Sequence, residues 1–355
     1  MQPFDYPLLL TPRFDAKIWG GRKLESVLGK SLPDDSPYGE SLESDDGSKI
    51  LNGPLAGATI GDLIRQDADA LLGPRGALAN SGQVGFPLLA KFIDAADVLS
   101  VQVHPDDDEA RPLGKRGKTE AWHIIAAEPD STLITGIKPE VSIGQIAQAI
   151  AEVRLGEYVI EQPVEAGDTL LVPAGTTHAI GAGILLYEIQ QASDVTFRMY
   201  DWGRLDDNGH PRELHVEKSL AVVKPDLQAR RIHPLRLSQG RQMLAACRYF
   251  ALERWDLSGK LQEIPFDGGS FRLASSISGT ATLTAGGQTI ELPAGQTALI
   301  PANVRELAIS GEGCLLVSYV PDLQQDVIEP LRHASYSDDE IAGLAGMLDH
   351  LQPAD

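Results

Sequence analysis

The stretch "EAGDTLLVPAGTTHAI" at residues 165–180 decides the fold, because "PAGQTALIPANVRELAI" at residues 293–309 repeats its pattern. Each copy has a glycine turn, an apolar run of strand length, a proline-marked turn and a second such run. The residues that coincide are Ala166 with Ala294, Gly167 with Gly295, Thr169 with Thr297 and Pro173 with Pro301. A repeat at this distance predicts two copies of one β-domain rather than a solenoid, whose period would be shorter.

The two copies differ at the position of His178, which coincides with Glu306 in the second copy. The second copy, roughly residues 240–322, contains no histidine, whereas the first contains His104, His123 and His178. We therefore expect any imidazole or metal chemistry in the first copy and a structural role for the second.

Composition and charge restrict the class of protein. A chain of 355 residues is long for one hydrophobic core, so two domains are expected. Its 35 glycines and 23 prolines imply many turns and favour a β-rich architecture. The net charge of -20 argues against nucleic acid or an anionic membrane as a partner. An anionic substrate would need a local basic pocket.

The sequence predicts a cytoplasmic protein. The opening "MQPFDYPLLL" lacks the basic start and long apolar run of a signal peptide, and no segment is apolar enough to span a bilayer. Cys247 and Cys314 lie beside apolar runs, so we expect buried free thiols rather than a disulfide.

Three stretches have helical periodicity, at residues 59–73, 141–153 and 337–351. Thr59 with Asp62 predicts a capping box at the first helix, and Ser337 with Glu340 predicts one at the third. The first two helices are expected to pack against a barrel wall, and the third to dock on the body of the protein. The apolar stripe of the third helix is Ile341, Leu344, Leu348 and Leu351.

Candidate metal ligands cluster in the first copy. In "LSVQVHPDDDEA" (residues 99–110) strand alternation places Gln102 and His104 on one face. Strands with glycine turns and a "PAGTTHAI" segment resemble the cupin, a small jelly-roll barrel that holds one metal among inward-facing side chains. In such a barrel Gln102, His104, Glu120 and His178 would meet, and this donor set suits zinc, iron or manganese.

Basic residues near these positions point to a phosphorylated substrate. In the strand reading Lys118 points the same way as Glu120, and Lys91 lies in an apolar stretch where a charge is costly unless it is paired. Arg198 follows Glu188 and Asp194. Converging cations of this kind would bind a sugar phosphate in an otherwise acidic protein.

The alternative is that such cationic side chains form salt bridges at the protein surface. This alternative is left open for Lys115 and Arg116, which precede Lys118 in the sequence.

Five motifs in order resemble type I mannose-6-phosphate isomerase in its shorter bacterial form. The match runs from about Pro12 through the second copy. The motifs are "VLSVQVHPDD" (98–107), "GKTEAWHII" (117–125), "VPAGTTHAIGAG" (172–183), "EIQQASDVTFRMYDWGR" (188–204) and "PRELHVEKSL" (211–220). The resemblance implies a cupin-type fold, one zinc ion per chain, and interconversion of mannose 6-phosphate and fructose 6-phosphate.

The resemblance also implies roles for individual residues. It places the family's active-site arginine on Arg198 and two pocket lysines on Lys91 and Lys118. In "YGESLE" (38–43) Leu42 stands where the family has tryptophan, which bears on packing at the substrate's edge. The four implied zinc ligands are Gln102, His104, Glu120 and His178.

The implied reaction moves a proton between C1 and C2 through an enediol. It needs a base and a group that stabilises negative charge on oxygen. Zinc can polarise the two oxygens, and Arg198 can stabilise the enediolate or hold the phosphate. Glu188, Asp194 and Lys118 are each candidates for the base.

We therefore expect a mainly β protein with two cupin-like jelly-roll barrels, a few packed helices and a C-terminal helix. Residues 1–230 would form the catalytic domain, 231–322 a metal-free second domain, and 323–355 a tail with an amphipathic helix. A monomer or homodimer acting on a small sugar phosphate, without nucleic acid or membrane, is expected. Alternative functions are isomerisation of another sugar phosphate, an iron-dependent dioxygenase, and a non-catalytic sugar-phosphate sensor.

Overall fold

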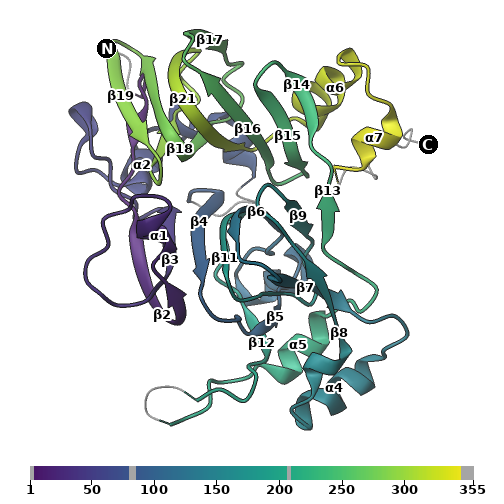
Figure 1. The fold of residues 1–355 in the computed structure, drawn as a ribbon. Coiled ribbons are helices and arrows are strands. Elements are labelled where there is room, and N and C mark those ends of the chain that lie inside the picture. The colour runs from purple at the N-terminus through teal and green to yellow at the C-terminus, as the bar shows by residue number, and fades with distance from the viewer. Residues whose placement is uncertain (1–3, 80–84, 206–208, 345–355) are drawn as a thin grey trace.

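A computed structural model describes residues 4–79, 85–205 and 209–344. The protein is mainly β, with 41% strand and 21% helix, as the turn-rich composition predicts. Most strands belong to two large sheets, one in each half of the molecule (Figure 1). None of the sheets in the described ranges closes on itself, so the expectation of two closed jelly-roll barrels is not confirmed.

The first half is built on a seven-stranded sheet in the order β13-β9-β6-β11-β4-β3-β2. Two small sheets, β10-β7-β8 and β12-β5, lie beside it. The strands of the large sheet are β2 (Arg13–Gly21), β3 (Tyr38–Ser44), β4 (Leu88–Ala95), β6 (Glu120–Ala127), β9 (Thr169–Val172), β11 (Ile184–Gln191) and β13 (Arg230–Ile232). The strands of the small sheets are β5 (Val101–Val103), β7 (Thr132–Ile137), β8 (Val159–Pro163), β10 (Ala179–Ile180) and β12 (Phe197–Tyr200).

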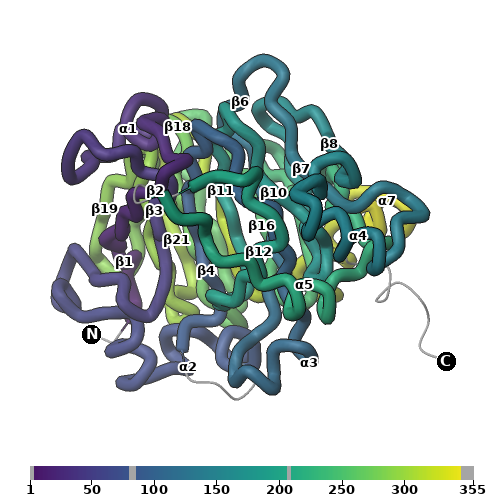
Figure 2. The backbone as a smooth tube through the Cα atoms, turned by 90° about the horizontal axis from the view of Figure 1, so that it is seen from below, coloured from purple at the N-terminus to yellow at the C-terminus, as the bar shows by residue number. Residues whose placement is uncertain are grey.

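The second half is built on a nine-stranded sheet along the path β1-β20-β18-β21-β16-β15-β14, with β17 on β21 and β19 on β18. The first strand, β1, pairs with β20, so the N-terminal segment lies beside C-terminal strands (Figure 2). The strands are β1 (Leu8–Leu9), β14 (Leu235–Ser238), β15 (Arg241–Ala246), β16 (Ala251–Ser258), β17 (Gln262–Pro265), β18 (Arg272–Ala285), β19 (Gln288–Pro293), β20 (Thr297–Ile300) and β21 (Glu306–Tyr319).

The sequence repeat places one equivalent strand in each large sheet, β9 in the first and β20 in the second. Both strands are buried throughout. Each follows a glycine with positive φ, Gly167 at 97° and Gly295 at 81°. The turn before each strand needs glycine because other residues adopt this backbone conformation at a cost.

Alternation along the strands of the first sheet separates two cores. On β4 and β11, Ile93 and Leu186 face a cluster inside the first half, whereas Phe92 and Tyr187 face a larger cluster shared with the second half. The hydroxyl group of Tyr187 lies 3.3 Å from that of Ser318 on β21. The two halves are therefore joined by a continuous apolar core.

The predicted helices are present with altered bounds. The first is α2 (Ile60–Leu78), which has the predicted capping box and continues past 73, although Gly73 breaks its helical backbone. The second is α4 (Ile143–Ala151), which packs in an apolar cluster beside the first half. The other helical segments are α1 (Lys23–Ser26), η1 (Gly53–Leu55), α3 (Asp107–Ala110), η2 (Arg111–Leu113), η3 (Leu155–Tyr158), α5 (Val216–Val222), the π-helical turn η4 (Leu323–Ile328) and α6 (Glu329–His333).

The third predicted helix begins as α7 (Asp338–Ala342), with the predicted capping box of Ser337 and Glu340. Of its predicted stripe, Ile341 and Leu344 are buried in the shared core. The other two residues, Leu348 and Leu351, lie outside the described residues.

Two further expectations can be compared with the structure. Cys247 and Cys314 are free and buried, as predicted. No helix in the described parts of the chain is long and apolar enough to cross a membrane.

Candidate active site

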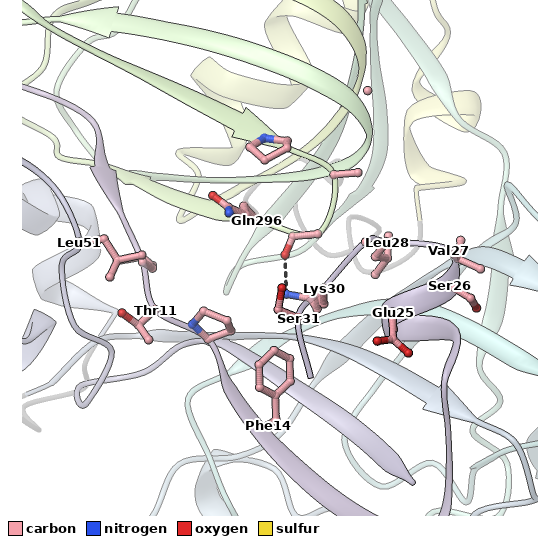
Figure 3. A pocket seen from close by; sticks show the side chains of 17 residues that line it. Thr11, Phe14, Glu25, Ser26, Val27, Leu28, Lys30, Ser31, Leu51 and Gln296 are labelled. Carbon is pink, nitrogen blue, oxygen red and sulfur yellow. Dashed lines mark hydrogen bonds between the residues drawn. The ribbon is translucent and has the colours of Figure 1, made fainter. Parts of the chain in front are cut away.

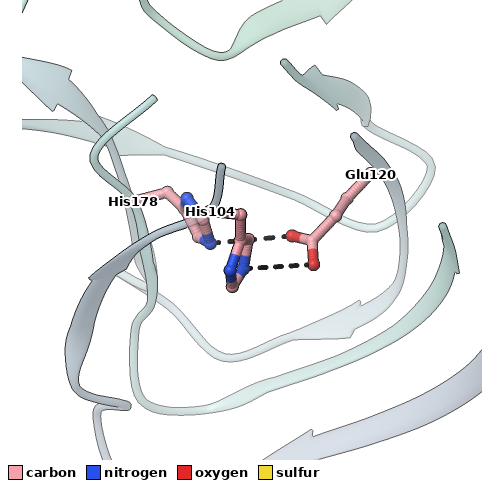
Figure 4. A group of neighbouring side chains, drawn as sticks. All are labelled: His104, Glu120 and His178. Carbon is pink, nitrogen blue, oxygen red and sulfur yellow. Dashed lines mark ion pairs between the residues drawn. The ribbon is translucent and has the colours of Figure 1, made fainter. Parts of the chain in front are cut away.

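Three of the four predicted metal ligands meet inside the first half. His104 follows β5, Glu120 begins β6, and His178 precedes β10. Their ligand atoms lie within 4.8 Å of one another, and each residue is only 1% exposed (Figure 4). Glu120 places Oε1 at 3.4 Å from Nε2 of His104, and Oε2 at 3.6 Å from Nε2 of His178.

Backbone carbonyls orient both imidazoles. Nδ1 of His104 lies 2.9 Å from the carbonyl of Val195, and Nδ1 of His178 lies 2.9 Å from that of Thr176. With the proton on Nδ1, each ring donates to its carbonyl and turns an unprotonated Nε2 toward Glu120. This arrangement is typical of metal-binding histidines.

Burial sets the charges of these three groups. It lowers the pKa of His104 to about 3, helped by the charge of Lys118, and it also lowers the pKa of His178. Burial alone would raise the pKa of Glu120, but Lys118 and then His104 outweigh it and hold that pKa well below its usual value. Near neutral pH the cluster therefore has two neutral imidazoles and one carboxylate.

The fourth predicted ligand, Gln102, reaches the cluster through its backbone. The backbone N–H and carbonyl of Gln102 exchange hydrogen bonds of 2.9 Å with those of His178. Its side chain is half-buried, and no hydrogen bond of its amide group is found among the described residues. The structure thus fixes the strand that bears Gln102 beside the cluster.

Lys118 lies directly against the candidate ligands, although it precedes β6 and is not part of the strand as predicted. Its Nζ is 2.6 Å from Oε1 of Glu120 and 3.2 Å from Nε2 of His104. The neighbouring His123, by contrast, points to the opposite side of β6, with Nδ1 2.9 Å from the hydroxyl of Thr169.

A second buried cluster surrounds Lys91 on β4. Its Nζ lies 3.7 Å from a carboxylate oxygen of Glu188 on β11 and 3.7 Å from one of Glu40 on β3. The indole N–H of Trp122 donates to the other oxygen of Glu188 at 2.9 Å. Burial raises the pKa of Glu188, and the charge of Glu120 raises it further, whereas Lys91 opposes the shift.

Glu40 is a polar member of this cluster that sequence reasoning missed. Burial would raise its pKa, but Lys91 and Lys17 outweigh that effect and lower it. Leu42, two residues later, is buried opposite Lys91 in the register of β3 and β4. Glu40 belongs to the "YGESLE" motif and could have been identified from it. The sequence interpretation considered only Leu42, which replaces the family's tryptophan.

Arg198 lies on β12, whose backbone pairs with Gln102 on β5. Its Nη1 donates to the carbonyl of Glu213 at 2.8 Å, and its Nε donates to the hydroxyl of Ser100 at 3.3 Å. Burial lowers the pKa of Arg198. The guanidinium is therefore held on the strand that neighbours Gln102.

Asp194 occupies a different environment. Its side chain is 75% exposed and forms an ion pair of 2.9 Å with Lys115. For Lys115 the surface salt bridge is thus the observed outcome. Asp194 makes no contact with the candidate ligands in the described residues.

A separate cavity of about 670 Å³ lies between the N-terminal segments and the second half (Figure 3). Lys30, which lines it, forms a buried ion pair of 2.7 Å with Glu43 and also donates to the carbonyl of Gly295. Neither the candidate ligands nor Lys91 and Lys118 line this cavity. Its contacts join the two halves and are distinct from the candidate active site.

Comparisons with known proteins agree with the resemblance. The family model "Phosphomannose isomerase type I, catalytic domain" matches residues 8–143, and "Mannose-6-phosphate isomerase, cupin domain" matches residues 241–320. The probable mannose-6-phosphate isomerase GmuF of Bacillus subtilis is 33% identical over 88% of this chain and 99% of its own. The mannose-6-phosphate isomerase of Streptococcus mutans is 33% identical over 88% of this chain and 98% of its own.

Solved structures show the same fold. The mannose 6-phosphate isomerase of Bacillus subtilis superposes with a TM-score of 0.78 at 32% identity, over 88% of this chain and 99% of its own. A mutant of phosphomannose isomerase from Salmonella typhimurium has a TM-score of 0.72 at 17% identity, over 89% of this chain and 99% of its own. The chain therefore is an isomerase and belongs to the type I phosphomannose isomerase family of the cupin superfamily.

Proposed function

We propose that the protein interconverts mannose 6-phosphate and fructose 6-phosphate with the help of one zinc ion per chain. The observation that carries the proposal is the buried cluster of His104, Glu120 and His178 in a chain of this family. Its relatives are named as mannose-6-phosphate isomerases, which supports the substrate.

The cluster fits a divalent metal. Nε2 of His178 is buried and has no hydrogen-bond partner among the described residues, a costly state unless a ligand meets it. Two neutral imidazoles and a carboxylate form a donor set that zinc accepts, and Gln102 is proposed as a fourth ligand. Zinc bound there would supply a Lewis acid for the two oxygens at C1 and C2.

Glu188 is the proposed base. Burial raises the pKa of its carboxyl group, and a raised pKa makes the carboxylate a stronger base. It would take the proton from C2 of the aldose and return it to C1, while the hydroxyl proton moves from O2 to O1. Trp122 holds one carboxylate oxygen, and the other faces Lys91.

The cations have separate proposed roles. Lys118 stabilises negative charge beside Glu120, and Lys91 keeps the carboxylates of Glu40 and Glu188 in place. Arg198 has Nη2 free of hydrogen bonds within the described residues and is proposed to hold the phosphate or the enediolate. The exposed Asp194 is proposed only for the rim of the substrate site.

The division of the chain is proposed as residues 1–230 for the catalytic domain, 231–322 for a metal-free cupin-like domain, and 323–355 for the tail. A cytoplasmic location is also proposed, because the two buried free cysteines suit a reducing compartment. The oligomeric state is proposed to be a monomer or a homodimer. Sedimentation would distinguish the two oligomeric states.

The proposal is tested by measuring the formation of fructose 6-phosphate from mannose 6-phosphate. Isomerisation of glucose 6-phosphate and of ribose 5-phosphate is measured separately for comparison. Turnover with mannose 6-phosphate well above that with the others is expected. Faster turnover of another sugar phosphate would identify a different isomerase on the same scaffold.

A further inference from the structure

A cavity of about 320 Å³ lies in the second half, away from the residues proposed for catalysis. Its lining residues come from β14 to β17, the ends of β18 and β21, and η4. Its volume is in the range of pockets that hold small ligands, about 300–1,000 Å³. The second copy of the repeat thus contains a cavity although it has no metal ligands.

Arg272 presents an unusual guanidinium group to this cavity. The residue is only 8% exposed, and its guanidinium carbon lies 3.9 Å from the ring centre of Tyr319 and 5.3 Å from that of Phe266. Nη1 donates to the carbonyls of Ser270 and Phe271 at 3.0 and 3.1 Å. In the described residues, Nε and Nη2 have no hydrogen-bond partner, and no carboxylate lies within 4.0 Å.

Asp326 on η4 offers an acceptor to the same cavity. One carboxylate oxygen accepts from the backbone N–H of Asp322 at 2.7 Å and pairs with Arg75 at 3.3 Å. The other oxygen has no hydrogen bond within the described ranges. Burial raises the pKa of Asp326, and the charges of Arg75 and Arg272 oppose the shift.

The remaining charges are satisfied among themselves. Arg241 pairs with Glu253 at 2.7 Å, and Glu253 also accepts from Trp255 and Tyr319 at 2.7 Å each. Asp267 pairs with Arg75 at 2.6 Å. Arg241 and Arg272 line the cavity with three carboxylates, and Arg75, outside the lining, pairs with two of these, so the charges around the cavity are balanced once Arg75 is included.

This balance determines the class of ligand. A ligand with a net charge would meet as much repulsion as attraction, whereas an uncharged ligand would not. The groups without a hydrogen-bond partner are two donors of Arg272 and one acceptor of Asp326, and both residues line the cavity together with Trp255, Phe266 and Tyr319. Adjacent hydroxyl groups of a sugar ring can accept from Arg272 and donate to Asp326. We propose that this cavity is a binding site for a neutral pyranose sugar, separate from the isomerase site.

The test uses methyl α-D-mannopyranoside and methyl α-D-glucopyranoside, which lack both a phosphate and a free C1 aldehyde and so are not substrates for isomerisation. Saturation-transfer NMR titration of the purified full-length protein is expected to show saturable binding of at least one of them. Arg272→Gln should weaken this binding at least about tenfold, the usual effect of losing a hydrogen bond to a charged group.

Two further variants keep the outcome clear if Arg272→Gln fails to fold. Ser238→Phe blocks the cavity at an exposed rim position and should also abolish binding. Arg332→Gln is the matched control, because it removes one cation from an exposed ion pair with Asp338 and should leave binding unchanged.

The proposal is overturned if the native protein binds neither glycoside, or if both Ser238→Phe and a folded Arg272→Gln bind as tightly as the parent. Loss of binding in Glu188→Gln would instead locate the sugar in the isomerase site and would also overturn it. Failure of the proposed isomerase activity would leave this test unaffected.

Discussion

Burial controls protonation at the residues that matter most. Burial, with the charge of the Lys118 ammonium, lowers the pKa of His104 to about 3 and also lowers that of His178. Neutral imidazoles are the form that binds metals, so the protein does not have to lose protons at these positions before it takes up an ion near pH 7.

Replacing a proposed ligand should remove metal and activity together. His178→Ala is expected to lose bound zinc and to lower kcat/KM at least about 100-fold, because one donor of the set is missing. The control is Glu306→Ala, at the equivalent exposed position of the second copy, which should keep both. Elemental analysis and turnover check this, and full activity in His178→Ala would contradict the site.

The proposed base makes a different prediction. Glu188→Gln is expected to lower kcat by about 10²- to 10⁴-fold, the usual contribution of a general base, while the zinc content stays unchanged. Asp194→Asn, with its exposed ion pair, should lower kcat by less than about threefold. The reverse ranking of the two variants would move the base to Asp194.

His123 should make stability sensitive to acid. Burial lowers its pKa to about 4, while in the unfolded chain its pKa is near the ordinary histidine value of 6.5. The unfolded state therefore binds an extra proton between these values, so stability falls as the pH drops from about 6.5 to about 4. The full shift corresponds to about 3 kcal/mol of unfolding free energy.

The variant His123→Gln should show a correspondingly shallower loss of unfolding free energy over this pH window, measured by urea unfolding at several pH values. The unfolding free energy of each protein near pH 7 serves as the baseline from which its loss at lower pH is measured. An unchanged slope would show that His123 is not the titrating group.

At the scale of elements, turns with required glycines start the two equivalent strands. A Cβ on Gly295 would lie 2.5 Å from the carbonyl oxygen of Leu28, whereas one on Gly167 would meet nothing within 4 Å. The two positions share a positive φ, so they differ only in steric room.

Because of this steric difference, alanine substitutions at Gly167 and Gly295 are predicted to lower the unfolding free energy by different amounts. Gly167→Ala should cost about 1–2 kcal/mol of unfolding free energy, from backbone conformation alone. Gly295→Ala should cost more, because the Leu28 segment must also move away. Urea unfolding of both variants checks the order, and equal losses would contradict the steric argument.

Elements could be predicted where local chemistry decides them. The capping boxes of Thr59 and Ser337 mark helix starts because their bonds join residues only three apart. The helical backbone also breaks at Gly73, where the first helix was expected to end, and a second helical segment follows directly. By contrast, β1 joins the sheet of the second half, a pairing that no local pattern reveals.

At the scale of the whole molecule, the repeat predicted two β-rich halves, and the apolar core around Tyr187 joins them. Barrel closure could not be judged from the repeat, because it depends on pairings between strands far apart in sequence. The candidate ligands His104, Glu120 and His178 were found because strand parity and the quoted motifs mark them. Glu40 was missed because only the neighbouring positions of β3 and β4 bring it to Lys91.

One zinc ion bound in the first half is proposed to make the chain an active isomerase. The most direct test is to strip the purified protein with a chelator and add zinc back stepwise while measuring fructose 6-phosphate formation from mannose 6-phosphate. Activity is expected to be absent in the stripped protein, to rise in proportion to added zinc and to level off at one equivalent per chain. Full activity in protein shown by elemental analysis to be metal-free would contradict it.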